Sequence, residues 1–174
     1  MSNKNLQLLI LRNAVLISIL ITLISCSYSF TGASVPPHIN SVAIPLFIDR
    51  SGTGELDVSE KITNSLIQKF NDDNTLLVTD RLKANSIVEG TIIAIKDDAA
   101  VVSGNETITR RRITINIKVI YKDLVKKQTI FERNFSNYED YSVEGDLFTS
   151  RQKAIDSAIE NITEDILLGV VSNW

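Results

Sequence analysis

The most regular pattern of the chain is an alternation of apolar and polar residues between Thr107 and Asp123. This period of two is typical of a β-strand with one covered face. The apolar set consists of Ile113, Ile115, Ile117, Val119 and Tyr121, and the polar set of Arg110, Arg112, Thr114, Asn116 and Lys118. The polar set is therefore expected to face water or a partner.

Further β-rich segments flank this strand. Ile87 to Lys96 precedes it across a polar, glycine-bearing segment, residues 97–106, so the two strands predict a long hairpin. A tight turn at Leu124 to Lys127 then leads into a further antiparallel strand, Gln128 to Phe135.

Two shorter apolar runs come earlier in the chain. Ser41 to Phe47 is rich in β-branched residues and predicts a strand buried on both faces. Pro45 cannot donate a ladder hydrogen bond, which favours an edge or a strand end. Thr75 to Thr79 predicts another short strand.

Helical spacing marks two segments. Asp57 and Glu60 have the spacing of a capping box, in which Asp57 caps backbone amides and Glu60 reaches back. A longer amphipathic helix is predicted from Asp146 to Val170, because its apolar residues recur every three or four positions. Together these elements predict an α+β fold with two helices on one face of a four- to five-stranded, mostly antiparallel sheet, whose other face has no cover.

The beginning of the chain predicts an export signal. Lys4 and Arg12 precede the uncharged run Ala14 to Ile24, about 11 residues long, whereas a membrane-spanning helix needs roughly 20. Leu23 to Cys26 resembles a bacterial lipobox, in which the cysteine is acylated and becomes the new N-terminus. The alternative is a free, buried cysteine after an ordinary signal peptide.

The expected organisation has three parts. Residues 1–25 are a lipoprotein signal peptide, residues 26–40 are the lipidated N-terminus and a tether, and residues 41–174 are one folded α/β domain. Cys26 is the only cysteine, and covalent N-acyl and S-diacylglycerol groups on it are the only non-protein groups expected. No other cofactor and no metal is predicted.

Charge and composition argue against several functions. The chain carries a net charge of −3, and the predicted signal peptide holds two basic residues and no acidic one, so the mature protein is more acidic still. It lacks the basic footprint of a nucleic-acid-binding protein. The only histidine, His38, lies in the tether, and Asp97 and Asp98 lie in a turn context typical of solvated carboxylates. No catalytic residues are predicted, and an enzyme is not expected.

Three cations are candidates for ligand binding. Arg110 and Arg112 point the same way about 7 Å apart, and Lys118 follows on that face. Guanidinium groups bind phosphate oxygens in a fork geometry, which would suit an anionic glycolipid head group. The alternative is a solvated strand whose cations meet acidic neighbours.

The residues also carry a resemblance to a known family. The segment CSYSFTGASVPPHINSVAIPLF, from Cys26 to Phe47, resembles the Bacteroidota type of the LptE lipoprotein family, and the long strand and terminal helix resemble the rest of it. The resemblance implies an outer-membrane lipoprotein, anchored at the periplasmic face, that plugs the LptD β-barrel. It also implies assistance in the assembly of lipopolysaccharide (LPS) into the outer leaflet and direct binding of LPS, for which Arg110, Arg112 and Lys118 are the candidates.

The sequence is also compatible with a second class of envelope protein. The run VAIPLF, followed by Asp49-Arg50 and a helix, also resembles CsgG-like lipoproteins, which build secretion pores or activate cell-wall synthases. A pore former would assemble into rings, and a synthase activator would bind an inner-membrane enzyme. The identity of the partner therefore distinguishes a CsgG-like protein from an LptE-like one.

Overall fold

The computed structural model describes residues 35–55, 57–102 and 108–172, so the predicted signal peptide and Cys26 lie outside the described residues. None of the helices in these ranges is both long and apolar enough to cross a membrane. In chain order the elements are β1 (Ser41–Ala43), β2 (Ile48–Asp49), α2 (Val58–Asp73), β3 (Leu77–Val78), β4 (Ser86–Val102), β5 (Ile108–Asp123), β6 (Gln128–Ser142) and α3 (Leu147–Val171).

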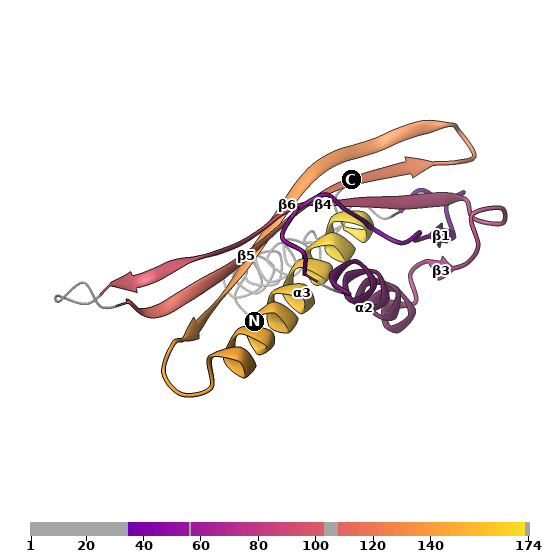
Figure 1. Ribbon diagram of the computed structural model, residues 1–174. Coiled ribbons are helices and arrows are strands. Elements are labelled where there is room, and N and C mark those ends of the chain that lie inside the picture. Colours follow the sequence, from indigo (N-terminus) through magenta and orange to yellow (C-terminus); the bar gives the residue numbers. More distant parts are fainter. Residues whose placement is uncertain (1–34, 56, 103–107, 173–174) are drawn as a thin grey trace, which may run out of the picture. The chain divides into compact units, whose positions relative to one another are not determined.

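The strands form one mixed sheet in the order β3-β1-β4-β5-β6, with β2 pairing to β4 beyond β1 (Figure 1). The three long strands are antiparallel, and Ile115 at their centre lies opposite Ile95 of β4 and Asn137 of β6. The short strands pair in parallel, since Val42 lies opposite both Val78 and Ser86. The α+β class with two helices on the sheet is confirmed, and within the described ranges the sheet has six strands where four to five were predicted.

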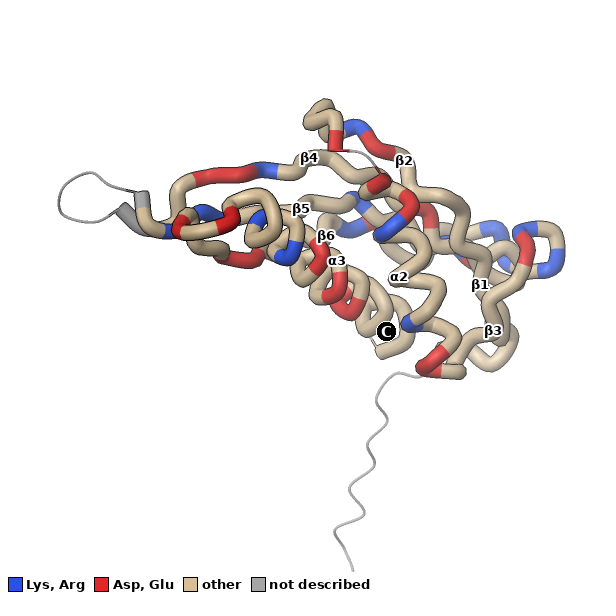
Figure 2. Tube along the Cα trace, turned by 60° about the horizontal axis from the view of Figure 1, so that its bottom comes forward, with Lys and Arg blue, Asp and Glu red and all other residues tan. Residues whose placement is uncertain are grey.

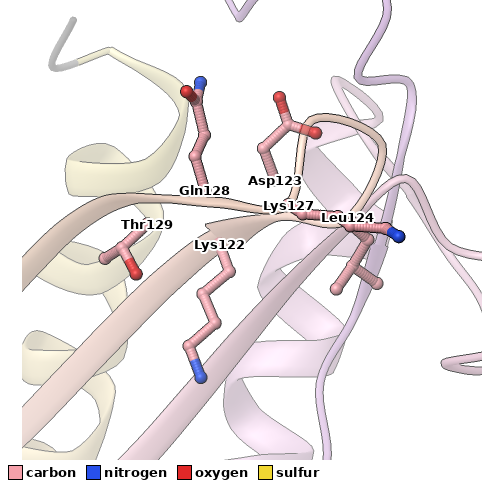
Figure 3. Close-up of a pocket in the computed structure, with 6 residues that line it drawn as sticks. All are labelled: Lys122, Asp123, Leu124, Lys127, Gln128 and Thr129. Atoms are coloured by element: carbon pink, nitrogen blue, oxygen red, sulfur yellow. The ribbon is translucent and has the colours of Figure 1, made fainter.

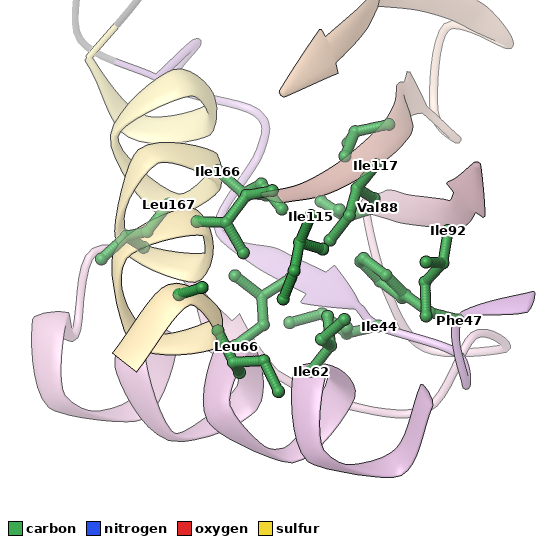
Figure 4. Packing of buried hydrophobic residues seen from close by; sticks show 14 of the residues in the cluster. Ile44, Phe47, Ile62, Leu66, Val88, Ile92, Ile115, Ile117, Ile166 and Leu167 are labelled. Atoms are coloured by element: carbon green, nitrogen blue, oxygen red, sulfur yellow. The ribbon is translucent and has the colours of Figure 1, made fainter. Parts of the chain in front are cut away.

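Helices α2 and α3 pack on one face of this sheet (Figure 4). The apolar residues of β5 fill that face: Ile113, Ile115, Ile117, Val119 and Tyr121 are all fully buried, as their alternation predicts. The stripe of α3 packs against them through Ile155, Ala158, Ile159, Ile162 and Ile166. Burial of each of these isoleucine side chains contributes roughly 1.5–3 kcal/mol, so this interface contributes substantially to stability.

Two glycines let aromatic rings pack directly against the backbone of a neighbouring element. A Cβ on Gly90 of β4 would lie 2.1 Å from Cε2 of Phe47, so the ring can lie on the strand only because position 90 has no side chain. A Cβ on Gly169 of α3 would lie 2.8 Å from Cζ of Phe135 on β6. Both positions let an aromatic ring fill space that a side chain would occupy.

The bounds of β1 and β4 differ from the prediction. Strand β1 ends at Ala43, two residues before Pro45, and the chain resumes pairing with β4 only at Ile48. The missing amide donor of proline explains the interruption. Strand β4 continues to Val102, so Asp97 and Asp98 are strand residues rather than turn residues. The backbone ladder continues there because its hydrogen bonds do not depend on side-chain polarity.

The two helices differ in whether a side chain caps the first turn. Asp57 precedes α2 with φ of 63° and makes no side-chain capping bond, so the predicted capping role is wrong. Its left-handed backbone does not have the extended geometry in which a side chain caps. Asp146 before α3 has the extended backbone that a cap needs, and its Oδ1 accepts a hydrogen bond from the Thr149 amide at 3.2 Å.

Candidate functional site

The face of β4, β5 and β6 opposite the two helices carries the predicted candidate residues. We call it the open face and define it by Arg110, Arg112, Thr114, Asn116 and Lys118 of β5, by Asn134, Ser136, Tyr138 and Asp140 opposite them on β6, and by Glu132, which pairs with Lys118. None of these side chains is among the buried residues. The structure therefore places Arg110, Arg112 and Lys118 on one polar surface, as the alternation predicts.

Arg112 is held by two groups of the neighbouring strand β6. Its Nε and Nη2 donate to Oδ1 and Oδ2 of Asp140 at 2.6 and 2.9 Å, a two-pronged ion pair. Its guanidinium also lies over the ring of Tyr138, 3.9 Å from the centroid. The hydrogen bond to Asp140 raises the pKa of Arg112, and the same bond lowers the pKa of Asp140. Arg112 is thus fixed in direction and half-exposed.

The other two candidate cations have different partners. Lys118 pairs with Glu132 of β6 at 2.5 Å. Arg110 is exposed, and its Nη2 donates to the backbone carbonyl of Asp140 at 3.3 Å rather than to a carboxylate. The open face is therefore a surface of paired charges in which Arg110 is the cation most available to an added anion.

Arg111, which the alternation places on the covered side, belongs to a charged cluster that sequence reasoning missed. Its Nε and Nη2 donate to Oδ1 and the backbone oxygen of Asp97 at 2.8 and 2.6 Å. The hydroxyl of Tyr141 donates to both carboxylate oxygens of Asp97 at 2.9 Å, and Arg151 of α3 donates from Nε at 2.9 Å. Arg151 also pairs with Glu55. The prediction of a solvated loop is therefore wrong for Asp97.

The cluster shows how Asp97 stays ionised while partly buried. Burial acts to raise the pKa of Asp97, but the hydrogen bonds from Arg111, Arg151 and Tyr141 outweigh it and the pKa is lowered. The signal in the sequence was Arg111 itself, because a guanidinium on the covered face of a strand requires an acidic partner.

A buried carboxylate with several hydrogen-bond partners lies at the opposite end of β5. Nε2 of His38 lies 2.6 Å from Oδ2 of Asp123, whose side chain is 1% exposed. Oδ1 of Asp123 accepts hydrogen bonds from the amides of Val125 and Lys126, both at 2.9 Å. Burial acts to raise the pKa of Asp123, and the bonds from His38 and the two amides lower it overall. Packing thus begins before Ser41.

The described residues contain no group of three histidine, cysteine, aspartate or glutamate side chains that could hold a metal ion. A depression of about 240 Å³ lies at the β5–β6 turn between Lys122 and Thr129 (Figure 3). Its wall holds lysines and the turn-capping Asp123, and it does not bring a nucleophile and a base together.

Solved structures show that this fold occurs in other bacterial proteins. The hypothetical protein CT253 from Chlamydia trachomatis is 13% identical with a TM-score of 0.58, covering 76% of this chain and 95% of its own. Lipoprotein B from Nitrosomonas europaea is 9% identical with a TM-score of 0.55, covering 76% and 83%. The PelC dodecamer from Paraburkholderia phytofirmans is 10% identical with a TM-score of 0.53, covering 77% and 90%. The fold is therefore an α+β domain that bacterial lipoproteins also have.

The family assignment rests on the sequence of the folded domain. Residues 39–168 match the LptE family, whose description is lipopolysaccharide-assembly. The chain belongs to the LptE family of lipopolysaccharide-assembly lipoproteins, which confirms the resemblance of its sequence to that family. A comparison with curated proteins gave no significant match.

Proposed function

We propose that the protein is a lipid-anchored subunit at the periplasmic face of the outer membrane that plugs the LptD β-barrel. In that position it assists the insertion of LPS into the outer leaflet. The observation that carries the proposal is the match of residues 39–168 to the LptE family, because it spans the sheet, α2 and all but the last three residues of α3.

The open face is suited to the role of a plug. The interior of a large membrane β-barrel is polar, so a plug needs a polar surface whose charges are largely satisfied before it enters. Uncovered strand residues such as Thr114, Asn116 and Ser136 offer hydrogen-bonding groups. The pairs Arg112–Asp140 and Lys118–Glu132 balance charge on the same surface. Such a surface supports contact with a polar barrel wall.

The same surface supports the proposed contact with LPS. Arg110 presents an exposed guanidinium to phosphate oxygens, and Arg112 and Lys118 continue the row along β5. Because Asp140 and Glu132 already accept from Arg112 and Lys118, a phosphate must share these cations with the carboxylates or replace them. This makes Arg110 the first contact and the other two secondary ones.

The proposed anchor is Cys26, carrying an S-diacylglycerol group and an N-acyl chain. Its support is the position of this single cysteine directly after an apolar run and a small residue, Ser25. Several acyl chains on one residue give an effectively stable membrane anchor, whereas one chain gives only marginal binding. The anchor therefore accounts for membrane attachment without a spanning helix.

Affinity purification tests the proposal. A C-terminally tagged chain is isolated from detergent-solubilised outer membrane, and co-purifying proteins and lipids are identified by mass spectrometry, with a Cys26→Ala variant as the control for the anchor. We expect a large β-barrel in equal stoichiometry, with LPS. A homo-oligomeric ring or an inner-membrane cell-wall synthase would overturn the proposal and favour the CsgG-like reading, for which the likeness to the PelC dodecamer is the relevant precedent in fold.

A further inference from the structure

Two loops meet at the end of the domain that carries β1 and β3. The segment 79–85 connects β3 to β4, and Leu124 to Lys127 connects β5 to β6. The amide of Leu124 donates to the backbone oxygen of Asn85 at 2.8 Å, so the two loops lie side by side. Figure 1 shows both loops at the same end of the sheet. We call this surface the basic end and define it by Leu82, Lys83, Val125, Lys126 and Lys127.

The basic end presents aliphatic side chains to solvent. Leu82, in the first loop, is 99% exposed, and Val125, in the second, is 56% exposed. Lys83, Lys126 and Lys127 flank them and are exposed as well. Isolated apolar residues on a surface are ordinary, but here two loops from distant parts of the sequence bring aliphatic and cationic side chains together.

The cations of the basic end are not neutralised by the acids around them. Asp123 is buried against His38, and Glu89 is bound by Lys122 at 2.5 Å and lies 3.6 Å from Arg81. Asp80 is the remaining acid of the two loops. Among the described residues, the ion pairs do not include Lys83, Lys126 or Lys127. Figure 2 shows several lysine and arginine positions beside β1 and β3, on a chain whose net charge is −3.

The described chain also starts at this end. His38 is bound to Asp123, at the base of the β5–β6 loop, and the hydroxyl of Ser41 donates to Oδ1 of Asn85, at the base of the other loop, at 3.0 Å. Val35 follows Cys26 by nine positions, a separation of at most about 30 Å. An anchor at Cys26 therefore keeps the bilayer surface within reach of the basic end.

We propose that the basic end docks on the anionic phospholipid surface of the membrane, with Leu82 and Val125 entering the interface and the three lysines contacting lipid phosphates. The inference rests on the lipid anchor of the proposed function and gives the protein a second membrane contact. A lipid surface fits better than a folded partner, because exposed aliphatic tips ringed by lysines suit a boundary that is apolar below and anionic above. Docking would fix the direction in which the anchored domain points.

A site-specific probe tests this proposal in the acylated protein. Because Cys26 is the only cysteine and is expected to be acylated, Val125→Cys introduces a single free thiol for an environment-sensitive fluorophore. Phe148→Cys is the matched control, since Phe148 is 77% exposed and lies at the start of α3. The labelled proteins are reconstituted into phosphatidylcholine vesicles with or without phosphatidylglycerol, and quenching by a nitroxide-bearing lipid is measured.

We expect strong quenching at position 125 on vesicles that contain phosphatidylglycerol, weak quenching on neutral vesicles or in high salt, and weak quenching at position 148 throughout. The substitutions Lys83→Gln, Lys126→Gln and Lys127→Asn should abolish the difference, where asparagine keeps the positive φ of Lys127. Each lysine near an anionic surface changes the docking equilibrium roughly fivefold, so the three together change it about a hundredfold. Substituting Lys96 and Lys153, which are exposed elsewhere, should leave quenching unchanged.

Equal quenching at positions 125 and 148 on anionic vesicles would overturn the proposal, and so would quenching that appears only when LPS or a barrel protein is added. Flotation of the labelled protein with neutral vesicles reports on the lipid anchor alone. Loss of flotation with salt-sensitive quenching retained on anionic vesicles would contradict the anchor and support the docking surface. Flotation without position-specific quenching would support the anchor and contradict the docking surface.

Discussion

The guanidinium of Arg151, in the second turn of helix α3, donates from Nε to Oδ2 of Asp97 on strand β4 at 2.9 Å. Asp97 also accepts from Arg111 of β5 and Tyr141 of β6, so one carboxylate joins three strands and a helix. Its side chain is 23% exposed, which limits how far water can replace these partners. The cluster therefore fixes the outer half of the long hairpin to the helical layer.

Replacing Asp97 with alanine should destabilise the domain by roughly 1–3 kcal/mol, because two guanidinium groups lose their acceptor in a partly buried site. Urea unfolding followed by circular dichroism measures the change. The matched control is Asp98→Ala, which removes the neighbouring, exposed carboxylate and should cost less than about 0.5 kcal/mol. Equal effects at the two positions would contradict the role of the cluster.

Gly90→Ala should destabilise the domain by roughly 1–3 kcal/mol, since the new methyl group overlaps the ring of Phe47 and forces the ring or the strand to move. Combining it with Phe47→Leu should cost less than the sum of the two single changes, because the smaller side chain leaves room for the methyl group. A double-mutant cycle in chemical denaturation measures this coupling. Additive effects would show that the contact does not limit position 90.

Acid should weaken the fold through Asp123. Its pKa in the folded state lies below the usual value of 3.8. The carboxylate therefore stabilises the fold at pH above 3.8, and this contribution is lost as the pH falls through the lower, folded-state pKa. In Asp123→Asn the free energy of unfolding should fall less over that interval than in the wild type, while the amide oxygen can still accept from Val125 and Lys126. Parallel pH profiles for the two proteins would argue against this assignment.

Substituting glutamine at Arg110, Arg112 and Lys118 together should weaken LPS binding by about tenfold or more, since hydrogen bonds to charged groups are lost. The dependence of the affinity on salt should also flatten. Binding to the purified protein is measured with fluorescent LPS over a salt series. The same charge change on the helical side, at Lys61, Lys69 and Lys153, is the control. Unchanged affinity in the strand variant, with an intact circular dichroism spectrum, would place the LPS site elsewhere.

Elements governed by local periodicity could be predicted from the sequence. The stripe that includes Ile155 and Ile166 predicted α3 to within a residue or two, because a long amphipathic helix depends on positions three and four apart. The alternation around Ile115 predicted both faces of β5 for the corresponding reason. The family resemblance was confirmed by a match over residues 39–168, which includes these regular elements but only the last part of the segment from Cys26 to Phe47.

Features that depend on distant residues could not be predicted in the same way. Asp97 looked like a turn residue because its neighbours are polar, but its partners Arg111, Tyr141 and Arg151 are brought to it only by the folded hairpin and helix. For a similar reason, the sequence predicted pairing of the open-face cations with acidic neighbours only as an alternative to ligand binding. Asp140 lies beside Arg112 only because β6 extends past Phe135, where the predicted strand ended.

The position of β1 has a consequence for the order in which the domain folds. The hairpins β4–β5 and β5–β6 join residues that are near in sequence, whereas Val42 of β1 must pair with both Val78 and Ser86. Contacts that close long loops form late because the entropy of closure is lost before they are made. We therefore expect β1 to insert last between its neighbours, which pulse-labelling hydrogen exchange would show as late protection of Val42. Until then, the hydrogen bonds beside β1, between His38 and Asp123 and between Ser41 and Asn85, are not expected to hold the start of the described chain on the domain.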